Sequence, residues 1–230
     1  MSEPVTADIA ARLDEVHAAM RARGHDPTLV TIIAVTKTHP LATVQAAMEA
    51  GLRIFGENRV QEAQQKIPPL TGSGAGFRLI GHLQANKARR AVELFDAIDT
   101  IDSPELAARV AHYAEHVGRA MPVLIEVNAS GEKAKSGCAW EDLDALVELC
   151  AGQEWMRLEG LMAMGPLEAS EVEVAACFRR VRDAFEAHRK HARDMRHCSL
   201  GMTADYLLAL DCGSNMVRLG TALFGARGAQ

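Results

Sequence analysis

The chain has 230 residues, of which 48% are hydrophobic, and its formal net charge at pH 7 is −5. This length allows one sizeable core, so we expect a single domain over residues 1–230. The negative charge provides no global field for nucleic acid or for an acidic membrane surface, and no apolar run approaches the roughly 20 residues that span a bilayer.

The cysteines and the N-terminal residues indicate the cellular compartment of the protein. The chain has 5 cysteines, an odd number, and none of them has C-x-x-C spacing. Residues 1–20 have neither the basic nor the apolar region of a signal peptide. We therefore expect reduced thiols and a cytoplasmic protein.

Short apolar or β-branched runs alternate along the chain with longer segments of helical periodicity. A first helix is predicted over residues 7–23. Strands are then predicted at 31–36, 53–56, 78–83, 97–101, 123–127, 158–164, 197–201 and 216–224. Helices are predicted between them at 41–50, 60–67, 86–95, 104–117, 141–151, 169–193 and 204–210.

This alternation is typical of a parallel sheet with helical crossovers. Eight strand–helix units in 230 residues fit a single (β/α)₈ TIM barrel with an extra N-terminal helix. The alternative is an open, doubly wound sheet. Its dinucleotide-binding form is not supported, because the first turn, residues 37–40, lacks a G-x-G-x-x-G pattern.

In such barrels the chemistry lies at the C-terminal ends of the strands. Ile33, Val35 and Lys37 share one face of the first strand, so Lys37 ends an apolar run. An amine there loses hydration, which favours the neutral form that attacks a carbonyl. The alternative is a solvated charge that marks the strand end.

The loops after the seventh and eighth strands are the usual phosphate site of these barrels. Gly201 and Gly220 let backbone N–H groups approach an anion, and Thr203 and Thr221 add hydroxyls. The glycines could instead serve only tight turns.

Three polar residues complete this set of candidates. Arg218 is the one charged residue between 216 and 224, and it belongs either to a structural ion pair or beside a ligand ring. Asn58 and His82 follow the second and third strands as candidate polar contacts. A lysine facing a phosphate cradle leaves two readings open: an aldolase-like sugar-phosphate Schiff base, or pyridoxal 5′-phosphate.

Seven stretches in chain order carry a resemblance to a known family. They are residues 34–40, 55–62, 80–87, 127–128 with 135–137, 160–164, 199–206 and 216–225. On these stretches the chain resembles the pyridoxal phosphate homeostasis proteins, whose fold is similar to the N-terminal barrel of alanine racemase.

The resemblance implies a role for each candidate. Lys37 would carry the cofactor, pyridoxal 5′-phosphate, and Arg218 would face its pyridine nitrogen. Asn58 would lie beside the ring, with His82 at the end of the third strand. The phosphate would be held by Met202, Thr203, Gly220 and Thr221. His39 stands where many relatives have a second lysine.

The same residues favour a carrier over an enzyme. Arginine cannot give up its proton, so Arg218 would leave the ring nitrogen unprotonated and weaken the electron sink. In alanine racemase a second base comes from an additional domain. The sequence ends at Gln230, soon after the last strand, so we expect no such domain. The alternatives are a racemase-type enzyme and a structural barrel with a vestigial site.

A carrier would store, shield or deliver the cofactor, with apo enzymes that depend on pyridoxal phosphate as acceptors, and we expect it to be a monomer. Lys133 and Lys135, in the loop after the fifth strand, are either a second amine near the mouth or solvated charges.

Overall fold

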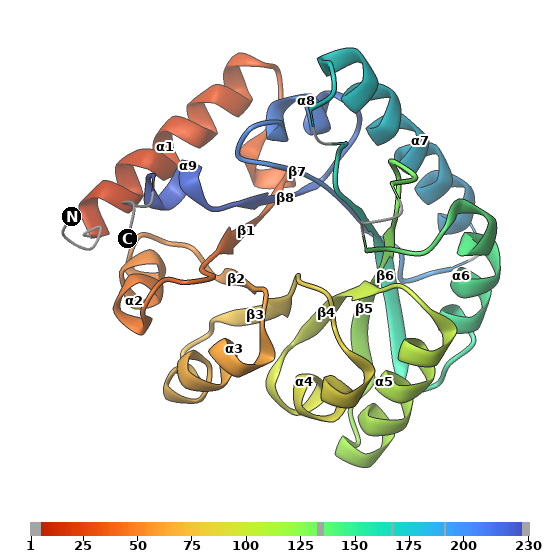
Figure 1. Cartoon of the computed structure of the whole chain (residues 1–230). Coiled ribbons are helices and arrows are strands. Elements are labelled where there is room, and N and C mark those ends of the chain that lie inside the picture. The colour runs from red at the N-terminus through yellow and green to blue at the C-terminus, as the bar shows by residue number, and fades with distance from the viewer. Residues whose placement is uncertain (1–5, 133–135, 167, 191, 227–230) are drawn as a thin grey trace.

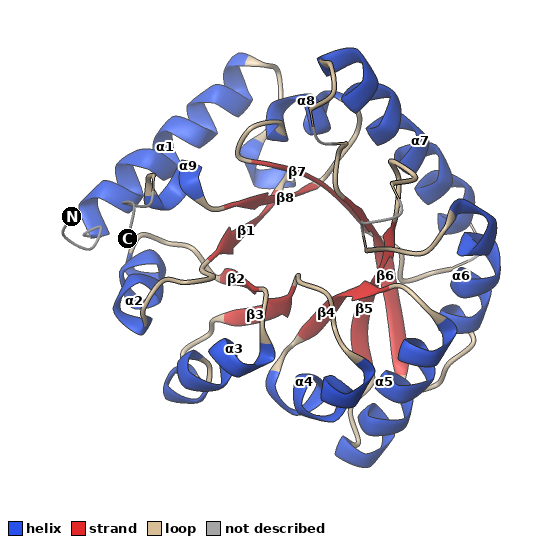
Figure 2. Cartoon of the chain, in the orientation of Figure 1, coloured by secondary structure: helices blue, strands red, loops and turns tan. Residues whose placement is uncertain are grey.

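Eight parallel strands close into a barrel in chain order in the computed structural model, which describes residues 6–132, 136–166, 168–190 and 192–226. The strands form an inner ring and the helices surround it (Figure 2). The strands are β1 Thr31–Val35, β2 Ile54–Glu57, β3 Gly76–Leu79, β4 Ala97–Ile101, β5 Met121–Val127, β6 Met156–Ala163, β7 His197–Met202 and β8 Met216–Leu219. The predicted (β/α)₈ barrel is confirmed.

The helices follow the strands around the ring (Figure 1). The N-terminal helix α1 Thr6–Ala22 lies beside α9 and α2, as predicted for an extra helix before the first strand. The others are α2 Leu41–Glu49, α3 Val60–Lys66, α4 Ala88–Leu94, α5 Pro104–Val117, α6 Leu143–Ala151, α7 Glu171–Arg189, α8 Tyr206–Asp211 and α9 Thr221–Phe224. Within the described residues, none of them has the length and apolar character to cross a membrane.

Local sequence explains where helices begin. Ser170 caps α7 through its hydroxyl, which accepts from the Glu173 N–H, while the Glu173 carboxylate accepts from the Ser170 N–H. This reciprocal arrangement is a capping box, and it starts the helix at Glu171 rather than at residue 169. Ser103 caps α5 through its hydroxyl alone, which accepts from the Leu106 N–H, and Pro104 occupies the first helical position.

Two predicted strands were wrong at their C-terminal ends. β3 ends at Leu79 rather than at residue 83, because the chain turns at Gly81, where a Cβ would lie 2.4 Å from the Asn58 carbonyl oxygen. β8 ends at Leu219 rather than at 224. Gly220 leaves the extended conformation, with φ −111° and ψ −81°, and residues 221–224 form α9.

The barrel interior holds apolar and ionic side chains. Ile33, Leu124, Met162 and Met216 form a small apolar cluster inside the ring. Arg78 of β3 donates to both Asp99 carboxylate oxygens at 2.7–3.0 Å. This buried bidentate pair is fully compensated, so it is a structural element of the barrel.

Glu159 of β6 extends this ionic group to the strand starts. It accepts from Arg157 and from Arg196, the residue before β7. Next to it, burial and the charge of Arg78 lower the pKa of His197 to about 4. The Arg196 Nε donates to the His197 Nε2 at 3.3 Å, which requires that nitrogen to be unprotonated. His197 is therefore neutral in the folded protein.

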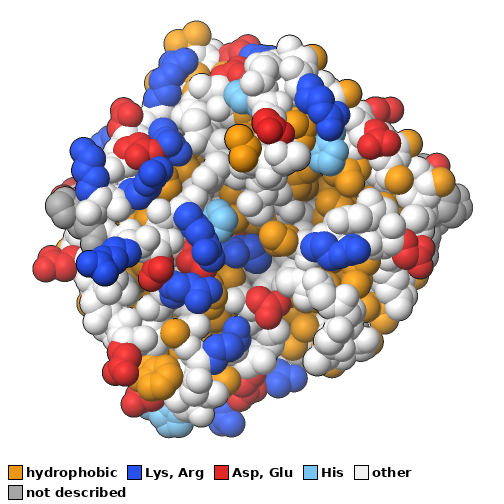
Figure 3. All heavy atoms as spheres, turned by 180° about the vertical axis from the view of Figure 1, so that it is seen from behind, with side chains coloured by type: hydrophobic (Ala, Val, Ile, Leu, Met, Phe, Trp, Pro, Cys, Tyr) orange, Lys and Arg blue, Asp and Glu red, His pale blue; other side chains and the backbone are white. Residues whose placement is uncertain are grey.

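Basic and acidic side chains are interspersed on the face seen from behind (Figure 3). Lys and Arg side chains gather near its middle, with acidic side chains among them. The two signs are therefore mixed on this face.

The neutral His197 makes a prediction about acid stability. Its folded pKa is depressed, so the unfolded chain binds more protons between pH 6.5 and about 4, and stability falls as the pH falls through this range. After discounting for partial exposure, we expect a loss of roughly 1–2 kcal/mol between pH 7.5 and 4.5. Urea denaturation of the protein and of His197→Gln measures it, and an equal pH dependence in both would contradict the assignment.

Candidate functional site

Lys37 lies in a tight turn immediately after β1, one residue beyond the predicted strand. The His39 N–H donates to the Thr36 carbonyl oxygen at 3.0 Å, and Thr38 has φ +64°, a conformation that is uncommon for threonine. Lys37 is half-buried, and its amine has no hydrogen bond or ion pair with the residues that the structure describes. The turn therefore presents an unpaired amine at the mouth of the barrel.

Lys66 of α3 stabilises this turn through hydrogen bonds. Its side chain is 5% exposed, and its Nζ donates to the Thr36 carbonyl at 2.7 Å, to Glu57 Oε1 at 2.9 Å and to Glu62 Oε1 at 2.6 Å. Glu62 Oε1 also accepts from the Thr38 N–H. Thr36 and Thr38, which flank Lys37, are thus both held by the Lys66–Glu57–Glu62 ionic group. We call these five residues the Lys66 cluster.

Glu57, at the end of β2, is completely buried in this cluster. Burial raises the pKa of its carboxyl, against the hydrogen bonds from the Thr36 hydroxyl at 2.7 Å and from Lys66. From the sequence alone, Glu57 follows the predicted second strand as either a helix-start charge or an acid–base group, and Lys66 is not identified as its partner. Only the helical spacing of Glu62 and Lys66 pointed to their pairing.

Arg218 of β8 is 4% exposed. Its Nη1 donates to the Ser199 carbonyl at 2.8 Å and hydroxyl at 2.9 Å, and its Nη2 donates to the Ala163 carbonyl at 2.9 Å. No carboxylate of the described chain lies within ion-pair distance of it. Of the two fates that the sequence left open, an ion pair is not observed. A buried cation of this kind retains donors for a ligand.

Glu126 of β5 is a buried carboxyl that the sequence reasoning missed. It is 2% exposed, and the Ser136 hydroxyl donates to its Oε1 at 3.0 Å, while no described group bonds its Oε2. Burial raises the pKa of Glu126, against the effects of Ser136 and Arg218. The signal was available: Glu126 is the single acid in the apolar run 121–127, as Arg218 is the single base in its own strand.

The two loops predicted to hold phosphate contact each other. The Thr203 hydroxyl, after β7, accepts from the Ala222 N–H, after β8, at 3.2 Å. Gly201 has φ +87°, and a Cβ there would lie 2.6 Å from the Ala209 Cβ, so this close approach of loop and helix needs glycine. At Gly220 a Cβ would make ordinary contact with Val35 atoms, at 3.6–3.7 Å, so the loop after β8 lies against the end of β1.

The remaining two phosphate candidates lie in the same loops. Met202 is 40% exposed, and its N–H already donates to Asp205 at 2.6 Å, so an anion there would compete with this carboxylate. Thr221 is exposed at the first position of α9.

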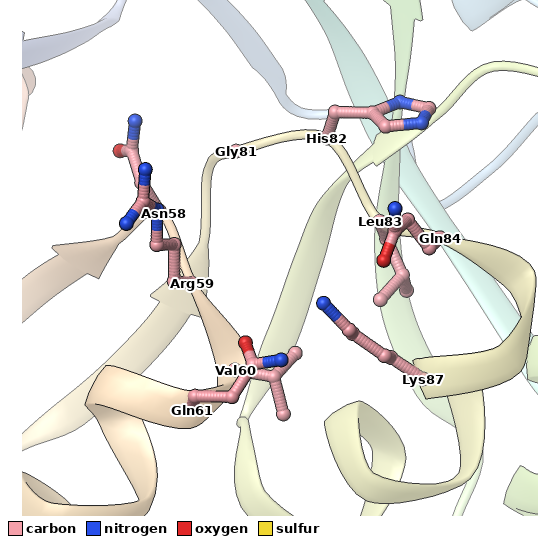
Figure 4. Close-up of a pocket in the computed structure, with 9 residues that line it drawn as sticks. All are labelled: Asn58, Arg59, Val60, Gln61, Gly81, His82, Leu83, Gln84 and Lys87. Atoms are coloured by element: carbon pink, nitrogen blue, oxygen red, sulfur yellow. The ribbon is translucent and has the colours of Figure 1, made fainter.

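Asn58 and His82 lie together on the opposite side of the mouth, because Gly81 lets their loops approach. Both line a cavity whose lining residues do not include Lys37 or Arg218 (Figure 4). His82 is exposed in the loop after β3, not at a strand end as predicted, and its Nδ1 lies 3.2 Å from Asp102 Oδ2. The Asn58 side chain has no hydrogen bond to the described residues.

Lys133 and Lys135 lie outside the described residues. His39 packs its ring on Phe224 of α9, with centroids 4.9 Å apart, so it joins the Lys37 turn to the helix after the Gly220 loop. Among the residues that the structure describes, no group of three metal-ligating side chains occurs.

The chain matches known families along most of its length. The model of the alanine racemase N-terminal domain matches residues 9–228. The pyridoxal phosphate homeostasis protein of Pseudomonas aeruginosa is 39% identical over 221 residues, covering 96% of this chain and 94% of its own. That of Escherichia coli K12 is 38% identical over 227 residues, covering 96% and 97%.

Solved structures agree with the sequence comparison. PipY of Synechococcus elongatus, determined with PLP bound, superposes with a TM-score of 0.83 at 37% identity, over 94% of this chain and 100% of PipY. Alanine racemase from Corynebacterium glutamicum matches with a TM-score of 0.71 at 17% identity, over 97% of this chain and 62% of the racemase, which supports the barrel fold alone.

The Lys66 cluster predicts a specific energetic pattern. Lys66→Met leaves Glu57 buried without its cation, and we expect a loss of about 2–4 kcal/mol of unfolding free energy at pH 7. Because the folded pKa of Glu57 is raised, this variant should lose further stability as the pH rises from about 4.5.

A double-mutant cycle with Glu57→Gln, followed by urea denaturation, measures the coupling. Lys66→Met/Glu57→Gln should recover part of the loss. The exposed pair Glu105–Arg109 is a matched control, and Arg109→Gln should change stability by less than about 0.5 kcal/mol. Strictly additive single losses would contradict a coupled buried pair.

Proposed function

The chain belongs to the pyridoxal phosphate homeostasis protein family, and we propose that it holds pyridoxal 5′-phosphate as a Schiff base on Lys37 and so helps to maintain the intracellular supply of this cofactor. The observation that carries the proposal is the position of Lys37. Its unpaired amine follows β1, and β1 pairs in parallel with β8, with Ile33 opposite Arg218 and Ala34 opposite Leu219. The amine and the Gly220 loop therefore stand at the ends of neighbouring strands.

Two buried groups at the mouth fit the cofactor. Arg218 is buried without a carboxylate partner among the described residues, and Glu126 has a buried oxygen without a hydrogen bond. The Thr203 and Thr221 hydroxyls with the Met202 and Gly220 backbone would hold the phosphate. Arg218 would donate to the pyridine nitrogen, and Asn58 and His82 would border the ring.

The cofactor supplies an aldehyde that condenses with an amine and a ring that draws electrons from it. Arg218 limits the second property. Its pKa is lowered by burial, yet it remains a donor-only group, so it holds its proton and does not protonate the ring nitrogen. A site that binds the aldehyde firmly and activates it weakly suits a carrier better than a catalyst.

We place the protein in the cytoplasm, as a monomer of one domain, with apo enzymes that depend on this cofactor as acceptors. Lys37 is half-buried rather than enclosed, so cofactor held there would remain within reach of an acceptor's lysine, whose amine would replace that of Lys37 in the bond.

A racemase-type enzyme is the second candidate, and Glu126 is the observation that favours it. Burial raises the pKa of its carboxyl, which favours the protonated form that a general acid requires. The carrier proposal predicts no α-proton exchange from alanine in deuterated water above the rate of free cofactor. Exchange that depends on Glu126, and is lost in Glu126→Gln, would replace the carrier with the enzyme.

Cofactor binding is tested by titration with pyridoxal 5′-phosphate, followed by visible absorption and equilibrium dialysis. We expect one equivalent to bind with a Schiff-base absorption band. Lys37→Arg keeps the charge but cannot form the bond, so the band should disappear and affinity should fall by more than about tenfold. Lys190→Arg, on an exposed lysine, is the matched control. An unchanged band in Lys37→Arg would overturn the proposal.

A further inference from the structure

A cavity of about 320 Å³ lies between the loops after β2 and β3, beside the proposed cofactor site (Figure 4). Its walls come from the loop 58–59 and the start of α3 on one side, and from residues 81–87 on the other. The buried side chains of Val60 and Leu83 supply its apolar part. The rest of the lining is polar.

Two cations border this cavity without counterions. Arg59 and Lys87 both line it, and neither side chain has an ion pair or hydrogen bond with the described residues. Neighbouring basic residues behave differently, since Arg89 and Arg90 on the same side both pair with Glu93. No acidic side chain lines the cavity, and the described acid that pairs with a lining residue, Asp102, contacts His82 rather than Arg59 or Lys87.

The other polar side chains add donors and acceptors. Asn58, Gln61 and Gln84 carry primary amides, and none of them has a side-chain hydrogen bond to the described residues. Figure 4 shows Asn58 and Arg59 next to each other on one wall, while Lys87 extends from the other wall with its amine toward Gln61. The cations thus lie on opposite walls, with unpaired amides on both.

From this arrangement we infer that the cavity is a binding site for a small organic dianion with a short apolar body. One anionic group would pair with Arg59 and the other with Lys87, the amides would bond the remaining oxygens, and Val60 and Leu83 would contact the carbon chain. Dicarboxylates and phosphate esters share this chemistry. The site is separate from the Schiff-base lysine, although Asn58 and His82 border both.

The cavity lies beside two residues that we propose contact the cofactor. A dianion here would lie between the loop that carries Asn58 and the loop that carries His82, the two residues proposed to flank the cofactor ring. Occupancy of the cavity would therefore bias how these loops meet the cofactor.

The test is a titration of the ¹⁵N-labelled protein with succinate, followed by amide chemical shifts. We expect shifts confined to residues 58–61 and 81–87, a dissociation constant that rises with salt because both cations are partly exposed, and no shifts with succinamide, the neutral analogue. Lys87→Gln and Arg59→Gln should each weaken binding by about tenfold. Arg90→Gln, which removes a cation that is already paired, should leave it unchanged.

Titrations with inorganic phosphate and glycerol phosphate show whether the site prefers dicarboxylates or phosphate esters. Tighter binding of the phosphates than of succinate, with the same dependence on Lys87, supports the site and assigns it to phosphate esters. Lys37→Arg should retain anion binding, so failure of the cofactor proposal and failure of this one are distinguishable. Absence of shifts at these residues, or shifts that persist in both Lys87→Gln and Arg59→Gln, would overturn the inference.

Discussion

The buried amine of Lys66 is the contact on which the geometry of the site depends. It joins the carbonyl before Lys37 to the carboxylate at the end of β2, and through Glu62 to the N–H after Lys37. A turn with threonine at positive φ costs conformational energy. The hydrogen bonds from Lys66 to the Thr36 carbonyl, from the Thr38 N–H to Glu62 and from the His39 N–H to the Thr36 carbonyl offset this cost. One ion pair in a neighbouring helix thereby places the reactive lysine at the end of its own strand.

The buried charges of the barrel fall into two kinds, those paired with an opposite charge and those without such a partner. Arg78, Asp99 and Glu159 satisfy one another, so burial costs little and the group stabilises the strands. Arg218 and Glu126, by contrast, are almost fully buried without an ion-pair partner among the described residues, and Glu126 Oε2 has no hydrogen bond. Unpaired buried groups cost stability, and a ligand can complete them. Glu57 Oε2, inside the Lys66 cluster, is also buried without a hydrogen bond, so an unpaired oxygen alone does not mark the binding end of the barrel.

Sequence reasoning predicted the barrel, its eight strands and the positions of Lys37, Thr203 and Arg218 at the mouth. It failed where tertiary contact overrides local pattern. The apolar residues 80–83 and 221–224 suggest strands, but close packing at Gly81 and the backbone of Gly220 turn the chain away from the sheet. Lys66 and Glu126 were missed because burial of a charged residue depends on partners distant in sequence, such as Thr36 and Ser136. The unpaired state of Arg59 and Lys87 likewise depends on which acids fold nearby.

The central claim is that Lys37 is the residue that holds the cofactor. Borohydride reduction of the cofactor-loaded protein, followed by proteolysis and mass mapping, tests it most directly, because reduction makes the bond permanent before the chain is cut. The account predicts a single pyridoxyl adduct on the peptide that contains Lys37. An adduct on Lys66, Lys87 or another lysine with Lys37 unmodified would contradict it.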